Sequence, residues 1–204
     1  MTGQSPTTFE VRQMAPAEAE ALGRLTVAAY TGLPGFAPGD AYLAELADVA
    51  GRAARGAVVL VAVDAGGHLL GGVTYVPGPG GGAGPAGQGS RAAREARDRP
   101  LAEFDDPAHA GIRMLAVAPE ARRRGVGTFL VRACIARARA EGRTRLWLHT
   151  TEAMRGARRL YERESFHRAP EADCLGPLHL LAYVLELEGL PVGTEGIEPS
   201  LGAV

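Results

Sequence analysis

The chain has 204 residues, of which 46% are hydrophobic and 22% charged, a mix that indicates a folded globular protein and excludes disorder as its overall state. Its formal net charge of −1 gives no excess of positive charge for non-specific nucleic-acid binding. All 22 basic residues are Arg, so a phosphate-binding loop with a lysine and Schiff-base chemistry are excluded. No apolar run is long enough for a membrane span and no secretory signal is visible, which predicts a cytoplasmic protein.

The first part of the chain predicts a strand, two helices and a hairpin. An alternating pattern favours a strand over 9–14, and Pro16 opens a helical pattern that ends near Tyr30. A second helix is expected with Asp40 as its cap, running through Val49. The hairpin is predicted from strands over 57–64 and 69–76.

A Gly- and Pro-rich segment at about 77–107 interrupts the pattern, and it is expected to form a disordered loop or a lid, with a loose helical turn over 90–106. Behind it the patterns predict three strands and two helices. In chain order these are a strand over 112–117, a helix from Val126, a strand over 145–150, a helix over 153–164 and a strand over 178–188. We expect one domain over 1–188 and a flexible tail over 189–204. The alternation of strands and helices predicts an α/β or α+β sheet with parallel crossovers in its second half.

The strand ending at Val117 and the helix from Val126 are joined by the sequence APEARRRG. Gly125 and Gly127 leave room for a ligand near the backbone, and the first amides of the helix have no partners within it. Three arginines and Thr128 add positive charge and a hydroxyl, so this join is a candidate diphosphate cradle. A dinucleotide fingerprint fails because Leu130 stands where a third glycine is needed. The alternative interpretation is a solvated arginine run before an ordinary helix.

Two motifs resemble those of the GNAT superfamily of acyl-CoA N-acyltransferases. Arg122 to Gly127 (RRRGVG) is similar to motif A, Q/R-x-x-G-x-G/A, and Ala157 to Phe166 (ARRLYERESF) is similar to motif B, A-x-x-L-Y-x-x-x-G-F. The resemblance is strong from Ile112 to Phe166 and looser upstream. It implies a GNAT-like fold: a mixed sheet of about six to seven strands, splayed at the cofactor site and flanked by about four helices.

The resemblance also implies the cosubstrate and the residues that hold it. Acetyl-CoA is expected, with its pantetheine arm along Leu115, Ala116 and Val117. Its diphosphate is expected on the segment that begins with Arg122, Arg123 and Arg124 and continues through Gly125, Val126, Gly127 and Thr128.

The residues that would donate and accept protons are less clearly indicated than those that would hold the cosubstrate. Tyr161 stands where many family members keep a tyrosine that protonates the CoA sulfur, although a tyrosine on this apolar helix face is also typical of a core residue. Gly111 replaces the glutamate that often serves as base. His149, near the end of a strand, is the candidate base, and His109, Glu103, Asp105 and Asp106 are alternatives. A chain of ordered water could also serve.

Two departures from motif B are Met154, where an Asn often contacts the cofactor, and Ser165, which replaces the usual Gly. Tyr30, Leu33, Phe36, Tyr42, Asp173 and His179 are expected on the acceptor side, as the family's architecture implies. The histidines have no ligand-like spacing, so no metal is expected. Cys134 lies on an apolar helix face and is expected in the core.

The sequence therefore predicts an N-acetyltransferase that moves an acetyl group directly from acetyl-CoA to a small-molecule or peptide amine. We expect a monomer or homodimer without nucleic-acid or membrane partners. Two alternatives stay open: a non-catalytic acyl-CoA sensor or regulatory module, and a nucleotide-binding α/β protein of another family.

Overall fold

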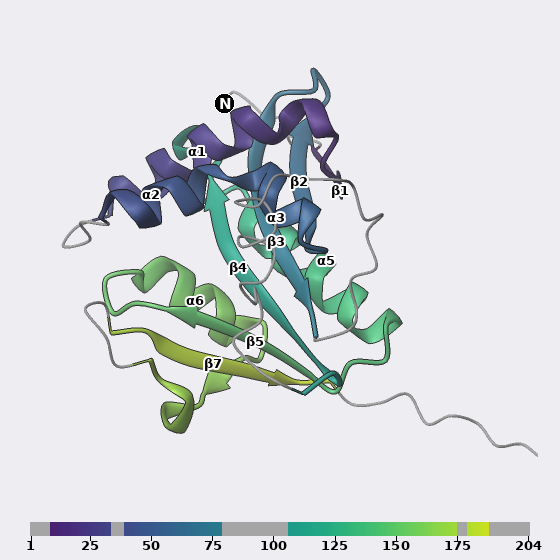
Figure 1. Cartoon of the computed structure of the whole chain (residues 1–204), viewed down its shortest axis with the longest axis vertical. Coiled ribbons are helices and arrows are strands. Elements are labelled where there is room, and N and C mark those ends of the chain that lie inside the picture. The colour runs from purple at the N-terminus through teal and green to yellow at the C-terminus, as the bar shows by residue number, and fades with distance from the viewer. Residues whose placement is uncertain (1–8, 34–38, 79–105, 175–178, 188–204) are drawn as a thin grey trace, which may run out of the picture.

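The computed structural model, which describes residues 9–33, 39–78, 106–174 and 179–187, contains a seven-stranded sheet with the order β1-β2-β3-β4-β5-β7-β6 (Figure 1). The strands are β1 (Phe9–Gln13), β2 (Val58–Asp64), β3 (Leu69–Pro77), β4 (His109–Val117), β5 (Arg145–Thr150), β6 (His167–Arg168) and β7 (Leu181–Glu186). The helices are α1 (Ala19–Thr31), α2 (Asp40–Ala47), α3 (Val49–Ala54), α5 (Val126–Ala140) and α6 (Arg155–Arg163). Three short 3₁₀ turns are η1 (Pro16–Glu18), η2 (Pro119–Ala121) and η3 (Pro170–Ala172).

The predicted α/β class and element order are confirmed, with several local differences. The second helix is divided at Asp48, whose side chain accepts a hydrogen bond from the Gly51 amide at 2.8 Å, so the described part has five helices instead of four. Asp40 is the first residue of α2, and Gly39 occupies the cap position that the prediction gave to Asp40. The short β6 was missed because two residues carry no readable alternation.

Some predictions fall on other parts of the chain. The tail over 189–204 and nearly all of the helical turn over 90–106 lie outside the described residues. Among the described residues, no helix is long and apolar enough to cross a membrane, and no cluster of three or more His, Cys, Asp or Glu side chains is placed to hold a metal ion.

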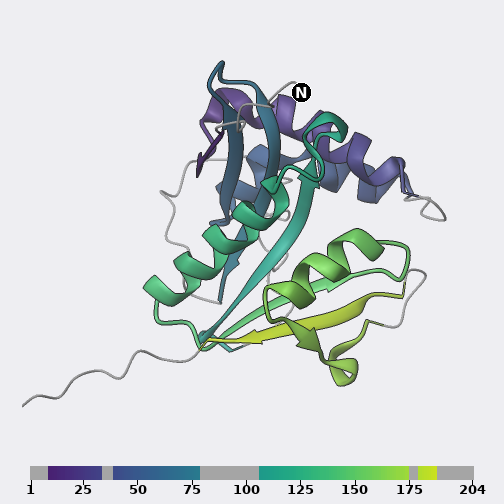
Figure 2. The ribbon, with the colours of Figure 1, turned by 180° about the vertical axis from the view of Figure 1, so that it is seen from behind.

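The sheet is covered on both faces. Helix α5 lies across β2, β3 and β4 on one face (Figure 2), and α1 and α3 pack on the other. Val126, Leu130, Val131 and Cys134 of α5 are buried at helical spacing in the largest core cluster. Burial raises the pKa of the Cys134 thiol to about 12, so it stays protonated, as expected for a core residue.

The sheet forks between β4 and β5. These two strands are parallel, but they pair only from His109 with Arg145 to Ile112 with Leu148. Beyond that point Met114 has a φ of 53°, and the register between β3 and β4 shifts between Gly72 and Thr74. This bulge bends β4 away from β5 and leaves the ends of both strands apart (Figure 1). All other pairs among the described strands are antiparallel. The prediction of parallel crossovers in the second half of the chain therefore holds for one strand pair, β4 with β5.

Candidate active site

A cleft of about 670 Å³ lies at the fork, between the end of β4, the start of α5 and one side of α6. It brings together nine of the ten residues predicted to hold the cofactor: Leu115, Ala116, Val117, Arg122, Arg123, Gly125, Val126, Gly127 and Thr128. Arg124 is the exception, because it does not line the cleft and its Nη1 lies 3.5 Å from the Glu120 carbonyl oxygen. Tyr30, near the end of α1, and Leu33, just beyond that helix, close the cleft from the other side.

The loop before α5 adopts an unusual backbone that presents amides to the cleft. Arg123 and Gly125 both have left-handed φ values, of 62° and 85°. The first hydrogen bond of α5 runs from the Phe129 amide to the Gly125 carbonyl at 3.1 Å, so the preceding amides of the first turn have no partner within the helix. These amides, at the positive end of the helix dipole, are suited to bind an anion.

Two residues at the end of β4, Leu115 and Val117, differ in how far their backbone is already paired. Leu115 lies in the bulge, without a register partner on β3, and beyond the last pair with β5. The Val117 carbonyl accepts a hydrogen bond from Arg122 Nε at 3.3 Å, so this oxygen is already engaged. An extended ligand can therefore pair with β4 at Leu115 without displacing a strand partner.

Sequence reasoning missed the contribution of α6. Arg155, Arg159 and Arg163 line the cleft opposite the loop before α5. Their spacing of four residues places them on one helix face, and this spacing was the available signal. Motif B specifies Leu160 and Tyr161, and the resemblance to it assigned no role to these arginines.

Tyr161 lies behind the wall of the cleft. It is 5% exposed, and its ring packs on Phe166 and Tyr183 with centroids 5.9 and 6.5 Å apart. Its neighbours Ala157 and Leu160 line the cleft, while Tyr161 does not. Burial raises the pKa of the phenol, so it is protonated at neutral pH. No hydrogen bond joins its hydroxyl to another described residue, which leaves the proton without an assigned acceptor among them.

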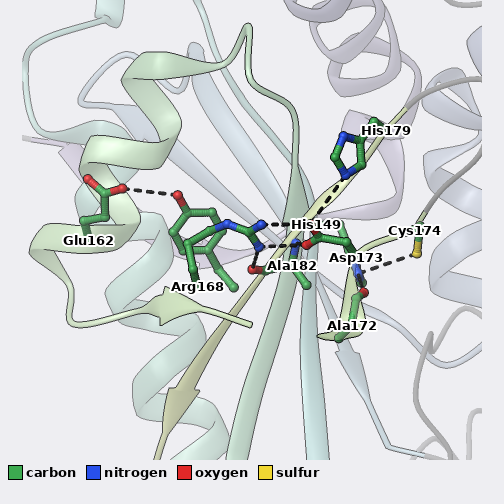
Figure 3. A network of polar contacts seen from close by, with 9 residues as sticks. His149, Glu162, Arg168, Ala172, Asp173, Cys174, His179 and Ala182 are labelled. Carbon is green, nitrogen blue, oxygen red and sulfur yellow. Dashed lines mark hydrogen bonds and ion pairs between the residues drawn. The ribbon is translucent and has the colours of Figure 1, made fainter. Parts of the chain in front are cut away.

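A second, smaller pocket of about 80 Å³ adjoins the cleft on the other side of the fork. Met154 and Tyr30 line both spaces, and Tyr42, Arg113 and His149 line the smaller one. His149 Nε2 lies 3.1 Å from the Ala172 carbonyl oxygen and 3.7 Å from Cys174 Sγ (Figure 3). Because only a protonated nitrogen can donate to a carbonyl, a neutral His149 in this contact carries its lone pair on Nδ1.

The other candidate bases are placed elsewhere. His109 Nε2 lies 3.5 Å from Asp106 Oδ2 at the start of β4, where β4 and β5 still pair. Five residues of strand, about 16 Å, separate His109 from the bulge at Met114, so neither His109 nor Asp106 lies near the fork. Glu103 and Asp105 lie outside the described residues, as does Phe36 of the predicted acceptor wall.

Asp173 and His179, also expected on the acceptor side, belong to a structural network and line neither space. Arg168 donates to both Asp173 oxygens at 2.7 and 2.8 Å, the Ala182 amide donates at 2.8 Å, and His179 Nε2 lies at 3.4 Å (Figure 3). These contacts hold the pKa of Asp173 well below its usual range. The network ties β6, η3 and β7 together directly beside Ala172, the hydrogen-bond partner of His149.

The charge of the cleft indicates the kind of ligand it fits. Five arginines and no aspartate or glutamate are among the residues that line it. A cation-rich cleft with free backbone amides and a bare glycine loop fits a polyanion such as a diphosphate. The residues present are therefore suited to hold the diphosphate of a nucleotide-type cosubstrate.

Comparison with known proteins agrees with this geometry. The model of the acetyltransferase (GNAT) family matches residues 24–166, more than half of the chain. No curated protein sequence shows significant similarity to the chain.

Solved structures of low sequence identity share the fold. A GNAT-family acetyltransferase from Staphylococcus aureus is 11% identical with a TM-score of 0.66, covering 89% of this chain and 100% of its own. A ribosomal-protein-alanine N-acetyltransferase from Brucella melitensis is 19% identical with a TM-score of 0.57, covering 87% and 99%. An aminoglycoside acetyltransferase in complex with coenzyme A is 21% identical with a TM-score of 0.59, covering 88% and 95%.

Proposed function

The chain belongs to the GNAT family of acetyltransferases, and from this premise we propose that its cleft binds acetyl-CoA and that the acetyl group passes directly to an amine held in the smaller pocket. The observation that carries this proposal is the continuity of the cleft, which runs from the amides of α5 to the fork between β4 and β5. Acetyl-CoA supplies an activated acetyl thioester, and a homologous fold is known with coenzyme A.

The loop before α5 and the end of β4 would each bind a different part of acetyl-CoA. The first amides of α5, with Arg122 and Arg123, would hold the diphosphate, and Thr128 would add a hydroxyl donor. Leu115, with Ala116 and Val117, would align the pantetheine arm as an added strand would pair. This arrangement would place the thioester at the fork, where the cleft and the smaller pocket meet at Met154.

Proton transfer would use a group on each side of the fork. The amine must be neutral to attack, and His149 Nδ1 is the proposed acceptor of its proton, directly or through water. Tyr161 is the proposed donor to the departing sulfur, supported by the position of its neighbours in the cleft wall and by burial, which raises the pKa of the phenol and so keeps its proton in place. Direct transfer is favoured because neither Cys134 nor Cys174 lines the cleft or the smaller pocket, and burial keeps the Cys134 thiol protonated.

The acceptor itself is a small-molecule or peptide amine. The two neighbours with named acceptors, a ribosomal-protein alanine and an aminoglycoside, act on very different molecules, so the fold does not select between them. Tyr30, Tyr42 and Arg113 give the smaller pocket aromatic surface and a cation, which are the features that an acceptor must match.

The function is tested by incubating the protein with isotope-labelled acetyl-CoA and a panel of amines and peptides, followed by mass spectrometry. The expected result is a product that carries the labelled acetyl group, and a His149→Gln variant should form it more slowly. Binding of coenzyme A without any labelled product from a broad panel would instead support a non-catalytic acyl-CoA sensor.

A further inference from the structure

Helix α6 presents a row of arginines to the cosubstrate cleft. Arg155, Arg159 and Arg163 recur every four residues, are exposed, and all line the cleft. A basic row on a helix is often only a solvated surface. Here the three side chains face the same space as Arg122 and Arg123, so five cations meet in one cleft.

The acidic residues in α6 and just after it do not neutralise this row. Glu162 accepts a hydrogen bond from the Tyr183 hydroxyl at 3.2 Å, and Glu164 pairs with Arg132 of α5 at 2.8 Å. Both carboxylates are thus engaged away from the cleft. Among the described residues, none forms an ion pair with Arg155, Arg159 or Arg163. The row therefore carries unneutralised positive charge into the cleft.

The row has a direction along the cleft. Met154, just before α6, lines both the cleft and the smaller pocket, so this end of α6 is next to the fork. Leu160 lies against the first turn of α5, where a Cβ added at Gly127 would be 3.0 Å from Leu160 Cδ1. Arg159 and Arg163 flank this contact, about 6 to 12 Å along the helix axis from Arg155. They lie at the end of the cleft where the diphosphate is proposed to bind.

The charge at this end exceeds what a diphosphate requires. The amides of α5, Arg122 and Arg123 already match its two negative charges. Coenzyme A also carries a phosphomonoester on the ribose 3′ oxygen, whose charge is about −1.5 to −2 at neutral pH. We propose that Arg159 and Arg163 form a separate anion subsite that binds the 3′-phosphate of coenzyme A and makes the protein selective against 3′-dephospho-CoA. This inference rests on the proposed function.

The test compares two ligands that differ in one phosphate. Calorimetry at fixed ionic strength measures the binding of coenzyme A and of 3′-dephospho-CoA, which needs no knowledge of the acceptor. The wild-type protein should bind coenzyme A at least about tenfold more tightly, since hydrogen bonds to a charged group contribute at this level. Arg159→Gln/Arg163→Gln should lose that advantage and bind 3′-dephospho-CoA as the wild type does.

The control is Arg139→Gln, which removes an exposed arginine at the far end of α5, outside the cleft. It should bind both ligands as the wild type does. If the double variant weakens both ligands equally, the two arginines serve the diphosphate and the inference is overturned. Equal affinity of the wild type for both ligands would also overturn it. Binding of neither ligand to the wild type would instead overturn the proposed function.

Discussion

Gly125 is the residue on which the diphosphate loop depends. Its φ of 85° is in the left-handed region, which glycine adopts without strain and other residues do not. It is also the N-cap residue of α5, so its conformation sets the direction of the first free amides. A side chain here would disturb both the backbone and the proposed ligand.

We expect Gly125→Ala to lower the free energy of unfolding by about 1–2 kcal/mol, the cost of a left-handed non-glycine residue, and to weaken coenzyme A binding. Urea denaturation and calorimetry measure the two effects. Gly142→Ala is the matched control, because Gly142 has a φ of 66°, lies just beyond the other end of α5 and has open space around its Cβ position. It should show a similar loss of stability and unchanged affinity. If both variants bind coenzyme A normally, the loop does not hold the ligand.

Tyr161 has two assigned roles that can be separated: its ring packs in the core, and its hydroxyl is the proposed proton donor. A Tyr161→Phe variant keeps the ring contacts with Phe166 and Tyr183 and removes only the hydroxyl. If the hydroxyl protonates the leaving sulfur, kcat should fall by about 100-fold or more with little change in coenzyme A affinity. Steady-state kinetics with an identified acceptor measure this. Unchanged kcat would mean that Tyr161 is a core residue alone.

At the scale of elements, the connection from β6 through η3 to β7 is held by one carboxylate. Asp173 joins the Arg168 guanidinium to the Ala182 amide. Its depressed pKa means that the folded state binds a proton more weakly than the unfolded state. Its contribution to stability is therefore present above the unfolded pKa of about 3.9 and is lost as pH falls toward the folded value.

We expect Asp173→Asn to be less stable than the wild type at pH 7, and the gap in the free energy of unfolding to narrow as pH is lowered from 5 toward 3. Denaturant titrations at several pH values measure this gap. His179→Gln should retain the acid dependence, since His179 is half exposed and lies at 3.4 Å, while Arg168 supplies two shorter bonds. A gap that stays constant with pH would contradict the assigned role of Asp173.

At the scale of the whole molecule, the fork divides the sheet into two parts that share only four residue pairs. Leu115 lies beyond these pairs and inside the bulge, where it has no register partner, so we expect its amide to exchange faster than those of paired residues. Hydrogen exchange followed by mass spectrometry should show slower exchange over 113–118 when coenzyme A binds. Residues 59–63 of the buried β2 should not change. Equal exchange of 113–118 with and without the ligand would place the pantetheine arm elsewhere.

Much of this architecture could be predicted from the sequence because its signals are local. The spacing of buried residues in α5 and the alternation in β1 follow from the periods of helix and strand. The fork could be expected only through the resemblance of motifs A and B to a known family, since no single residue of β4 indicates where pairing with β5 stops.

What could not be predicted depends on contacts distant in sequence. The arginine row on α6 indicates an anion site only because it lines the same cleft as Arg122 and Arg123, which are more than thirty residues away in the sequence. His109 was a candidate base by its residue type, but its place at the paired end of β4 removes it from the fork. Composition and periodicity contain no information about which end of a strand faces a ligand.

The hairpin between β3 and β4 has a practical consequence. Pro77 pairs with Ala110 and Val76 with Gly111, so the end of β3 and the start of β4 lie side by side, in the middle of the sheet and at the opposite end of β4 from the fork. A guest domain or affinity tag whose own two ends lie close together would fit between these two strand ends without separating β3 from β4. This position is therefore an attachment point for immobilising or labelling the protein at the opposite end of β4 from the fork.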